Sequence, residues 1–140
     1  MVVAGGSGVP IGVHLASATP GEATLAEATL RTVRVPRPGP GRPKTNPPRV
    51  IADRAYDSLR LREALARRGI DLIAPHLRTR KHKVQDGRKL RRYRRRWIIE
   101  RTNSWINTSY RRLTCRWDTS LTVFSGFLHI ALMLICLRRL

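Results

Sequence analysis

The sequence is poor in cysteine, and this shortage excludes one class of site. Its 140 residues include only Cys115 and Cys136, with no CxxC pair and no cluster of cysteine with histidine. The spacing needed for a zinc site is therefore missing, and two idle thiols are typical of a reduced, cytosolic protein. The four histidines are scattered, which favours ordinary surface or core imidazoles over metal ligands. The first ten residues lack the basic and long apolar regions of a secretory signal.

Acidic residues are also scarce. Nine aspartates and glutamates stand against 28 lysines and arginines, which gives a formal net charge of +19. A charge of this size attracts a polyanion, with nucleic acid as the first candidate and an anionic membrane surface as the second. The hydrophobic fraction of 41% is nevertheless ordinary for a globular chain, so we expect one folded domain rather than disorder throughout.

The N-terminal half predicts elements in an order typical of a layered α/β protein. Residues 1–35 predict a hairpin around a Gly-Gly-Ser-Gly turn, followed by a helix from Glu22 to Arg34. Residues 36–49 are rich in proline and glycine, so we favour a plain basic linker loop over a segment that lies along a phosphate backbone. Residues 50–75 predict strand, helix and strand, which favours parallel pairing with a crossover helix.

The C-terminal half begins with a basic loop and a long helix. Residues 76–90 are polar and without period, and residues 91–113 predict a helix with two distinct faces. One face carries Tyr93, Arg96, Trp97, Glu100, Ser104 and Asn107. The opposite face carries Ile98, Thr102, Trp105, Ile106 and Ser109. We expect the second face, including Trp105, to pack in a core while the first presents the carboxylate of Glu100.

Residues 120–138 form an uncharged and almost wholly apolar segment. Its apolar run of about 17 residues is at the short limit for crossing a bilayer, and Ser125, Gly126 and His129 interrupt it. We favour a helix buried in the core over a membrane anchor, and we expect no membrane partner.

Two acidic residues, Asp53 and Glu100, are candidate ligands of a metal ion. Asp53 ends the strand predicted from residue 50, and parallel sheets place function at the carboxyl ends of their strands. If the Glu100 helix packs across that edge, two carboxylates converge, which suits Mg²⁺ or Mn²⁺. Each acid also has an ordinary interpretation, Asp53 as the cap of a turn and Glu100 as an ion-pair partner of Arg96 or Arg101. The neighbouring Asp57 is interpreted as a helix N-cap.

The chain resembles a known family in two stretches, IADRAYDS at 51–58 and YRRRWIIERTNSWINTSYRRL at 93–113, with a closing LICLRRL. The family is that of bacterial insertion-sequence transposases of the DDE type, whose catalytic core is ribonuclease-H-like, and the likeness is to their C-terminal part. The family's ADxxYDS motif places its second catalytic aspartate at Asp53. Its tyrosine–arginine–glutamate signature matches Tyr93, Arg96 and Glu100.

This resemblance implies a DNA transposase. It implies that Asp53 and Glu100 are catalytic residues and ligands of Mg²⁺ (or Mn²⁺), and that the partner is DNA, both the element ends and the target. The residues expected to contact the DNA backbone are Tyr93, Arg96, Arg92, Arg95, Lys89 and Arg101. The basic run from Arg78 to Arg96 is expected to follow phosphates, with binding that weakens as salt rises. The signature commonly continues with a lysine, where this sequence has Asn107.

The family's first catalytic aspartate precedes the hairpin, whereas this sequence has no aspartate before Asp53. We therefore expect residues 1–140 to form a single truncated domain. This domain would be an incomplete ribonuclease-H-like α/β core, followed by the long basic helix with Glu100 and the apolar helix.

The truncation bears on activity and partners. The isolated chain is expected to be inactive unless a chain from an upstream reading frame supplies the first aspartate, and a homo-oligomer is compatible with the resemblance. The expected location is the cytoplasm, in association with the nucleoid. Two alternatives stay open, a non-catalytic basic nucleic-acid-binding protein and, less favoured, a small membrane-anchored protein.

Overall fold

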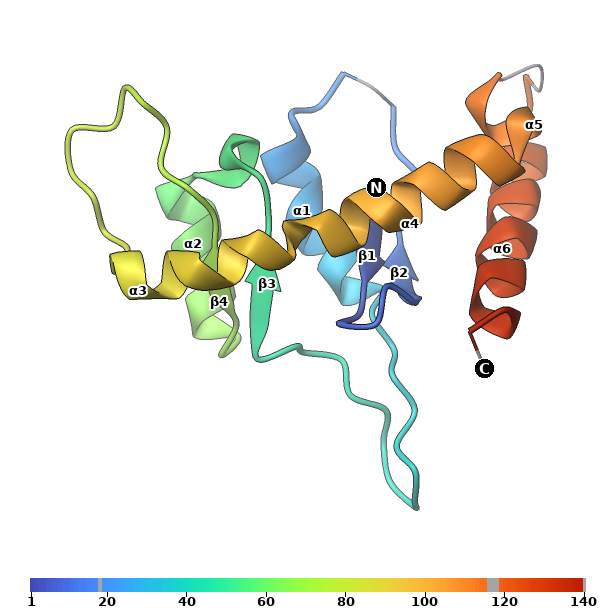
Figure 1. The fold of residues 1–140 in the computed structure, drawn as a ribbon, viewed down its shortest axis with the longest axis horizontal. Helices are drawn as coiled ribbons and strands as arrows, with labels where there is room; N and C mark the ends of the chain where they lie inside the picture. Colours follow the sequence, from blue (N-terminus) through green and yellow to red (C-terminus); the bar gives the residue numbers. More distant parts are fainter. Residues whose placement is uncertain (18, 116–118, 140) are drawn as a thin grey trace. The chain divides into compact units, whose positions relative to one another are not determined.

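The computed structural model describes residues 1–17, 19–115 and 119–139, so the last residue of the LICLRRL stretch lies outside it. The chain has mixed α/β structure (Figure 1). It divides into two compact units. The first unit comprises Met1–Val3 and Gly12–Arg96, and the second comprises Ala4–Ile11 and Trp97–Leu140. The expected α/β class is confirmed in this general form.

The first unit is built on a pair of parallel strands, β3 (Arg49–Ile51) and β4 (Asp71–Ile73). Parallel neighbours need a crossover, and the helix α2 (Leu59–Arg67) supplies it. Val50 pairs with Leu72 at the centre of the register. The predicted strand–helix–strand order and its parallel pairing are therefore confirmed.

Helix α2 ends at a glycine for a conformational reason. Gly69 has a φ of +71°, a region that disfavours residues with a Cβ. This turn lets the Ile70 N–H donate to the Leu65 carbonyl oxygen at 2.9 Å and the Gly69 N–H donate to that of Ala66, also at 2.9 Å. The pair of bonds satisfies carbonyl groups at the helix end and leads the chain straight into β4.

Apolar side chains from α2 and β4 form the core of the first unit together with the helix α1 (Glu22–Arg31). Leu65 and Ile73 are fully buried, and Leu30 is almost so. Helix α1 ends three residues before the predicted Arg34. The chain leaves the helix there because Val33, which is only 1% exposed, turns into the core.

The hairpin predicted at the N-terminus is present as β1 (Val2–Ala4) and β2 (Pro10–Val13), paired in a two-stranded sheet. Gly8 in the connecting loop has a φ of +90° and is buried. Its carbonyl oxygen accepts a 2.8 Å hydrogen bond from the Thr102 hydroxyl of α4 (Trp97–Ser109), within the second unit. The loop therefore lies closely against that helix.

The long helix expected over 91–113 is divided. Four residues of the expected loop form α3 (Gly87–Leu90), the segment Arg91–Arg96 is a 3₁₀ helix (η2), and α4 gives way to α5 (Arg111–Thr114). Five of the six η2 residues are arginines, and like charges three and four positions apart destabilise an α-helix. At the other end, the Thr108 hydroxyl donates to the Ser104 carbonyl, a local bond that competes with helix continuation.

The two faces predicted for this segment are confirmed in part on α4, because Ser109 of the expected buried face is exposed. Ile98, Thr102 and Ile106 are buried, whereas Glu100 is exposed. Trp105, however, is half-buried rather than in the core. Its ring is covered by two arginine side chains, Arg101 at 5.0 Å and Arg139 at 4.2 Å from guanidinium carbon to ring centroid. Cation–π contact thus replaces burial.

The apolar helix α6 (Leu121–Leu137) is buried on one face only. Leu128, Ala131, Leu132 and Ile135 are buried, while side chains on the other face, such as Met133, stay exposed. The expectation of a helix buried in the core is therefore correct for one face of α6 only. Within the described residues, no helix combines the length and apolar character needed to cross a bilayer.

The close approach at Gly8 gives a stability test. At the Gly8 φ of +90° a residue with a Cβ is strained, and its Cβ would also lie 2.9 Å from the Arg101 Nη2 atom and displace that side chain. Gly8→Ala should therefore lower the free energy of unfolding by about 2 kcal/mol, chiefly through backbone strain. The control is Gly126→Ala on α6, where a Cβ meets nothing within 4 Å and helix propensity should raise stability by about 0.5–1 kcal/mol. Urea unfolding would measure both, and equal effects would contradict the packing of the loop.

Candidate active site around Asp53

Asp53 stands at the carboxyl end of β3. The Ala52 N–H still donates to the Ile73 carbonyl at 3.0 Å, so the sheet pairing continues to the residue before it. Asp53 then caps the 3₁₀ helix η1 (Arg54–Tyr56), accepting a 2.6 Å hydrogen bond from the Arg54 backbone N–H. Its side chain is 56% exposed. Asp53 therefore caps a turn, as its ordinary interpretation expected, and also presents a carboxylate at the strand end, while its role as a metal ligand stays a prediction.

Two residues of the tyrosine–arginine–glutamate signature lie beside this carboxylate. The Tyr93 hydroxyl donates to Asp53 Oδ1 at 3.2 Å, and Arg96 Nη1 lies 3.8 Å from Asp53 Oδ2. Both come from η2, where a 3₁₀ helix places residues three apart on the same side. The Arg96 guanidinium also lies 5.5 Å from the centroid of the Tyr93 ring. Residues forty positions apart in the sequence thus share one site.

The surroundings keep Asp53 ionised. The backbone hydrogen bond from Arg54 is the largest cause that holds the pKa of Asp53 below its usual value, against an opposing effect of partial burial. The Tyr93 hydroxyl and the Arg96 charge lower it further. The pKa of Tyr93 is raised, chiefly by burial, so its hydroxyl stays protonated as a donor. An exposed, ionised carboxylate can serve as a hard oxygen ligand for a divalent cation.

The other residues predicted for the site are placed as follows. Glu100 is exposed on α4 in the second unit, so its convergence with Asp53 in the first unit stays a prediction. Arg92 and Arg95 are exposed on η2, and the Lys89 ammonium donates to Asp71 at 3.0 Å. Within residues 1–17, 19–115 and 119–139, no three His, Cys, Asp or Glu side chains gather closely enough to hold a metal ion by themselves.

Arg101, a further predicted DNA contact, is engaged within the second unit. Its guanidinium carbon lies 4.6 Å from the Trp97 ring centroid, in addition to the Trp105 contact, and its Nη2 donates to the Ser7 carbonyl at 3.0 Å. These contacts fix the hairpin loop on α4. They supply a packing role for Arg101, and its contact with DNA stays a prediction.

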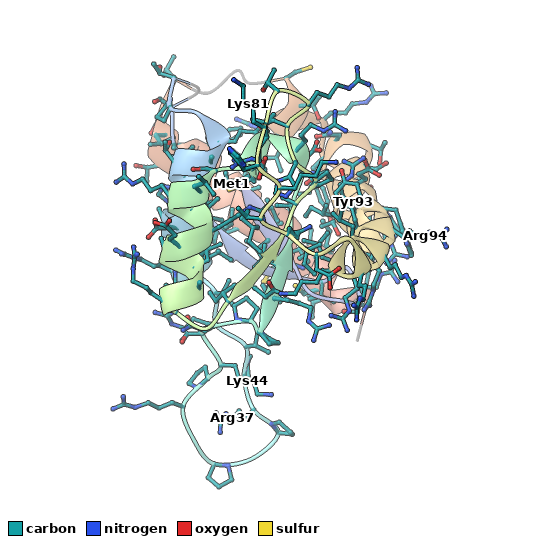
Figure 2. All side chains as sticks on the ribbon, turned by 90° about the vertical axis from the view of Figure 1, so that its left-hand side faces the viewer. Met1, Arg37, Lys44, Lys81, Tyr93 and Arg94 are labelled. Carbon is teal, nitrogen blue, oxygen red and sulfur yellow. The ribbon has the colours of Figure 1, made fainter. Side chains whose placement is uncertain are left out.

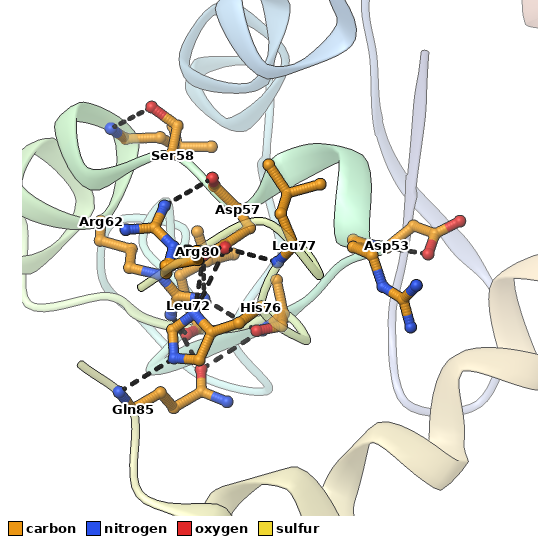
Figure 3. Close-up of polar contacts among 12 residues, drawn as sticks. Asp53, Asp57, Ser58, Arg62, Leu72, His76, Leu77, Arg80 and Gln85 are labelled. Atoms are coloured by element: carbon orange, nitrogen blue, oxygen red, sulfur yellow. Dashed lines mark hydrogen bonds and ion pairs between the residues drawn. The ribbon is translucent and has the colours of Figure 1, made fainter. Parts of the chain in front are cut away.

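Asp57, four residues after Asp53, differs from its predicted role. The N-cap of α2 is Ser58, whose hydroxyl oxygen accepts from the Leu61 N–H at 3.4 Å. The Asp57 side chain is fully buried, and it accepts from the Arg62 Nη2 at 2.9 Å, the Arg80 Nε at 2.7 Å and the Leu77 N–H at 2.9 Å (Figure 3). A buried carboxylate needs such partners, whereas a cap residue does not. The sequence held one signal, because two cap-type residues stand in a row and only one can cap.

The partners of Asp57 hold the basic loop after β4. His76 Nδ1 lies 3.1 Å from Asp57 Oδ1, and His76 Nε2 accepts from the Gln85 N–H at 3.3 Å, so the proton shared with Asp57 is on Nδ1. Arg62 also donates to the carbonyl of Ala74 and to the side-chain oxygen of Gln85, both at 2.8 Å. We call Asp57, Arg62, His76, Arg80 and Gln85 the Asp57 cluster. It joins α2, the end of β4 and both ends of the loop.

The charge of Asp57 makes the stability of the chain depend on pH. Burial raises the pKa of Asp57, but the hydrogen bonds from Leu77, Arg80, Arg62 and His76 outweigh it and hold that pKa well below its usual range. Stabilisation by a carboxylate with a depressed pKa is complete above its unfolded pKa of about 4 and is lost as pH falls through the folded value. Acid should therefore weaken the first unit from about pH 5 downward.

Asp57→Asn should test this. Removing one charge from a buried pair costs about 3 kcal/mol, so the variant should be that much less stable at pH 7, and its stability should fall less steeply in acid than the wild type's. Chemical denaturation at a series of pH values would measure it. Asp71→Asn, which removes a half-exposed ion pair with Lys89, is the control and should cost under about 1 kcal/mol. Parallel pH profiles for Asp57→Asn and the wild type would contradict the assignment.

Comparison with known proteins identifies the family of the chain. Residues 1–136 match a family model described as "Transposase DDE domain". The chain is also 32% identical over 135 residues to a putative transposase for insertion sequence element IS402 from Burkholderia cepacia. That alignment covers 96% of this chain and 60% of the relative, so the chain spans about three fifths of the length of the relative it matches. No solved structure matches the chain.

The family model spans the hairpin, the Asp53 site, the Asp57 cluster and the helices that follow. It therefore includes both stretches that the sequence singled out, at 51–58 and 93–113. The chain belongs to the family of transposases with a DDE domain.

Proposed function

We propose that this chain provides part of the catalytic domain of a DNA transposase, with a ribonuclease-H-like core. In this proposal Asp53 and Glu100 act as ligands of divalent ions at the site of phosphodiester cleavage and strand transfer. The observation that carries it is the Asp53 site. There, an exposed and ionised carboxylate at the end of a parallel strand contacts Tyr93 and Arg96, the two residues that precede Glu100 in its signature.

The residues present fit a divalent cation in part. Asp53 offers an ionised oxygen ligand that is open to solvent, and Glu100 offers a second exposed carboxylate on a regular helix. We assign only these two ligands to residues 1–140, since the sequence has no aspartate before Asp53. Mg²⁺ or Mn²⁺, when bound, supplies the charge that polarises a phosphodiester and activates a nucleophile.

The neighbours of Asp53 have roles of their own in this proposal. The Tyr93 hydroxyl orients the carboxylate by donating to Oδ1, which leaves Oδ2 as the less occupied oxygen. Arg96, 3.8 Å from Oδ2, adds a positive charge where a backbone phosphate would approach the site. The same contacts keep Asp53 ionised at neutral pH, which a metal ligand requires.

The basic segment around η2 supplies contacts to DNA. Arg92, Arg94 and Arg95 are exposed, and Arg94 points outward from the helix in Figure 2. Flexible cations on one exposed segment suit phosphates of a nucleic-acid backbone, which fix position rather than read sequence. We propose that this segment, with Lys89, holds DNA near Asp53 by contacts that weaken as salt rises.

Removal of the two acids tests the metal role. Asp53→Asn and Glu100→Gln should each lower the affinity for Mn²⁺ by about tenfold or more, while the affinity for duplex DNA in chelator stays equal or rises because a negative charge is lost. Mn²⁺ binding would be measured by electron paramagnetic resonance and DNA binding by fluorescence anisotropy. Any Mn²⁺-dependent nicking of DNA that carries element ends should disappear with the same variants.

The control is Asp86→Asn, which changes an exposed acid in the same basic region and keeps a side chain able to cap α3. If Asp53→Asn and Glu100→Gln bind Mn²⁺ as this control does, the metal role is wrong. A non-catalytic basic DNA-binding protein would then be the remaining function for the chain.

A further inference from the structure

The proline-rich segment between α1 and β3 forms a ribbon that the proposed chemistry does not use. Its ends are joined by an antiparallel bridge, in which the Val35 N–H donates to the Lys44 carbonyl at 3.0 Å and the Lys44 N–H donates back at 2.8 Å. Every residue from 36 to 44 is exposed. Figures 1 and 2 show the ribbon extending outward from the helices and strands of its own unit. We call residues 36–43 the proline arm.

A plain connection does not explain this arm. The bridge brings residues 35 and 44 side by side. A turn of two residues would be enough to connect them, yet eight residues lie between them. An excursion of this kind is open to solvent on all sides and adds nothing to the core. The arm is therefore accessible to a partner outside its own unit.

The arm is held in shape although it is exposed. Its four prolines restrict φ, and Gly41, with a φ of +135°, provides the change of direction at the tip. Its base is anchored on both sides, by buried Val33 before it and after it by Asn46, which exchanges hydrogen bonds of 3.2 and 2.9 Å with Arg68. A pre-ordered segment loses little conformational entropy when it binds a partner.

The side chains of the arm select the kind of partner. Arg37 and Arg42 lie in the arm, Lys44 closes its base, and the sequence has no acid between Glu27 and Asp53. The tip, Pro38 to Gly41, carries nothing larger than proline, and the Arg37 side chain passes within 4.0 Å of where a Cβ of Gly41 would lie. Aromatic anchors, which dominate protein–protein interfaces, are missing from the arm's sequence. A slim, purely basic arm fits a polyanion.

We propose that the proline arm is a second DNA-binding element, which enters the minor groove of A/T-rich duplex DNA with Arg37 and Arg42. The minor groove is only about 6 Å wide, so it admits a slim arm without large side chains. A/T-rich tracts narrow this groove and strengthen its negative potential, which attracts inserted arginines. The inference takes DNA as partner from the proposed function, but it does not depend on the metal ligands Asp53 and Glu100.

The test removes the two arginines of the arm. In the full chain, Arg37→Gln combined with Arg42→Gln should weaken binding to an A/T-rich duplex by about tenfold and abolish the preference for A/T-rich over G/C-rich duplexes. The slope of log affinity against log salt concentration should fall by the equivalent of about one to two phosphate contacts. Fluorescence anisotropy at several salt concentrations would measure all three. Netropsin, which occupies the minor groove, should compete with the wild type more strongly than with the variant.

The control removes two exposed arginines from α2 of the same unit, Arg60→Gln with Arg67→Gln, and so takes away the same charge. This control should weaken binding to both duplexes equally and keep the A/T preference. Replacement of residues 36–43 by Asn-Gly, with circular dichroism to check folding, should have the same effect as the double variant. Because the double variant changes only exposed side chains, it decides the test even if the shortened chain fails to fold.

An A/T preference that is missing from the wild type, or that survives in the double variant, would overturn the inference. Equal losses for the arm variant and the α2 control would overturn it as well, because charge alone would then explain the binding. Asp53→Asn should keep the A/T preference. If the metal-binding test fails, the proposed function is refuted, but the inference that the proline arm binds DNA is not.

Discussion

The first unit depends on one buried negative charge. A carboxylate removed from water is tolerated only when donors surround it, and Asp57 has them from a helix, a backbone amide and a loop. Arg62 is the central donor, since its guanidinium also binds the carbonyl oxygens of Leu72 and Ala74 at the end of β4. Strands of three residues offer few ladder hydrogen bonds, so this cluster gives the short sheet much of its fixed arrangement.

The same cluster holds the candidate active site in place. Asp53 and Asp57 flank the single turn η1, in which the Tyr56 N–H donates to the Asp53 carbonyl and the Asp57 N–H donates to that of Arg54, both at 3.0 Å. One end of the turn is therefore fixed by a buried charge, and the other end presents an exposed one. Asp57 is thus joined to Asp53 by the three residues of η1, a short hydrogen-bonded connection that restricts where the Asp53 backbone can lie.

The sequence predicted local structure and missed contacts between residues that are distant in the sequence. The parallel strands, the α2 crossover and the hairpin follow from hydrophobic period, capping residues and glycine, and all were confirmed. The buried face of α4 was confirmed for Ile98, Thr102 and Ile106 only. Asp57 was mistaken for a cap because its four partners lie between five and 23 residues away, beyond any local pattern. The contact of Tyr93 with Asp53 was missed for the same reason, since the helical wheel associated Tyr93 with Glu100 alone. The break at η2 was missed because charge repulsion outweighed helix propensity.

The Asp57 cluster also limits how this chain can change over generations. Loss of Asp57 leaves two mostly buried arginines without the carboxylate that they share, and loss of either arginine leaves a buried carboxylate with fewer donors. Each single replacement gives a destabilised protein, whereas replacement of the whole set by apolar residues need not destabilise it. We therefore expect these residues to co-vary among related sequences, so that they are either all kept or all exchanged. Their joint retention in a diverging lineage would follow from this mutual dependence alone.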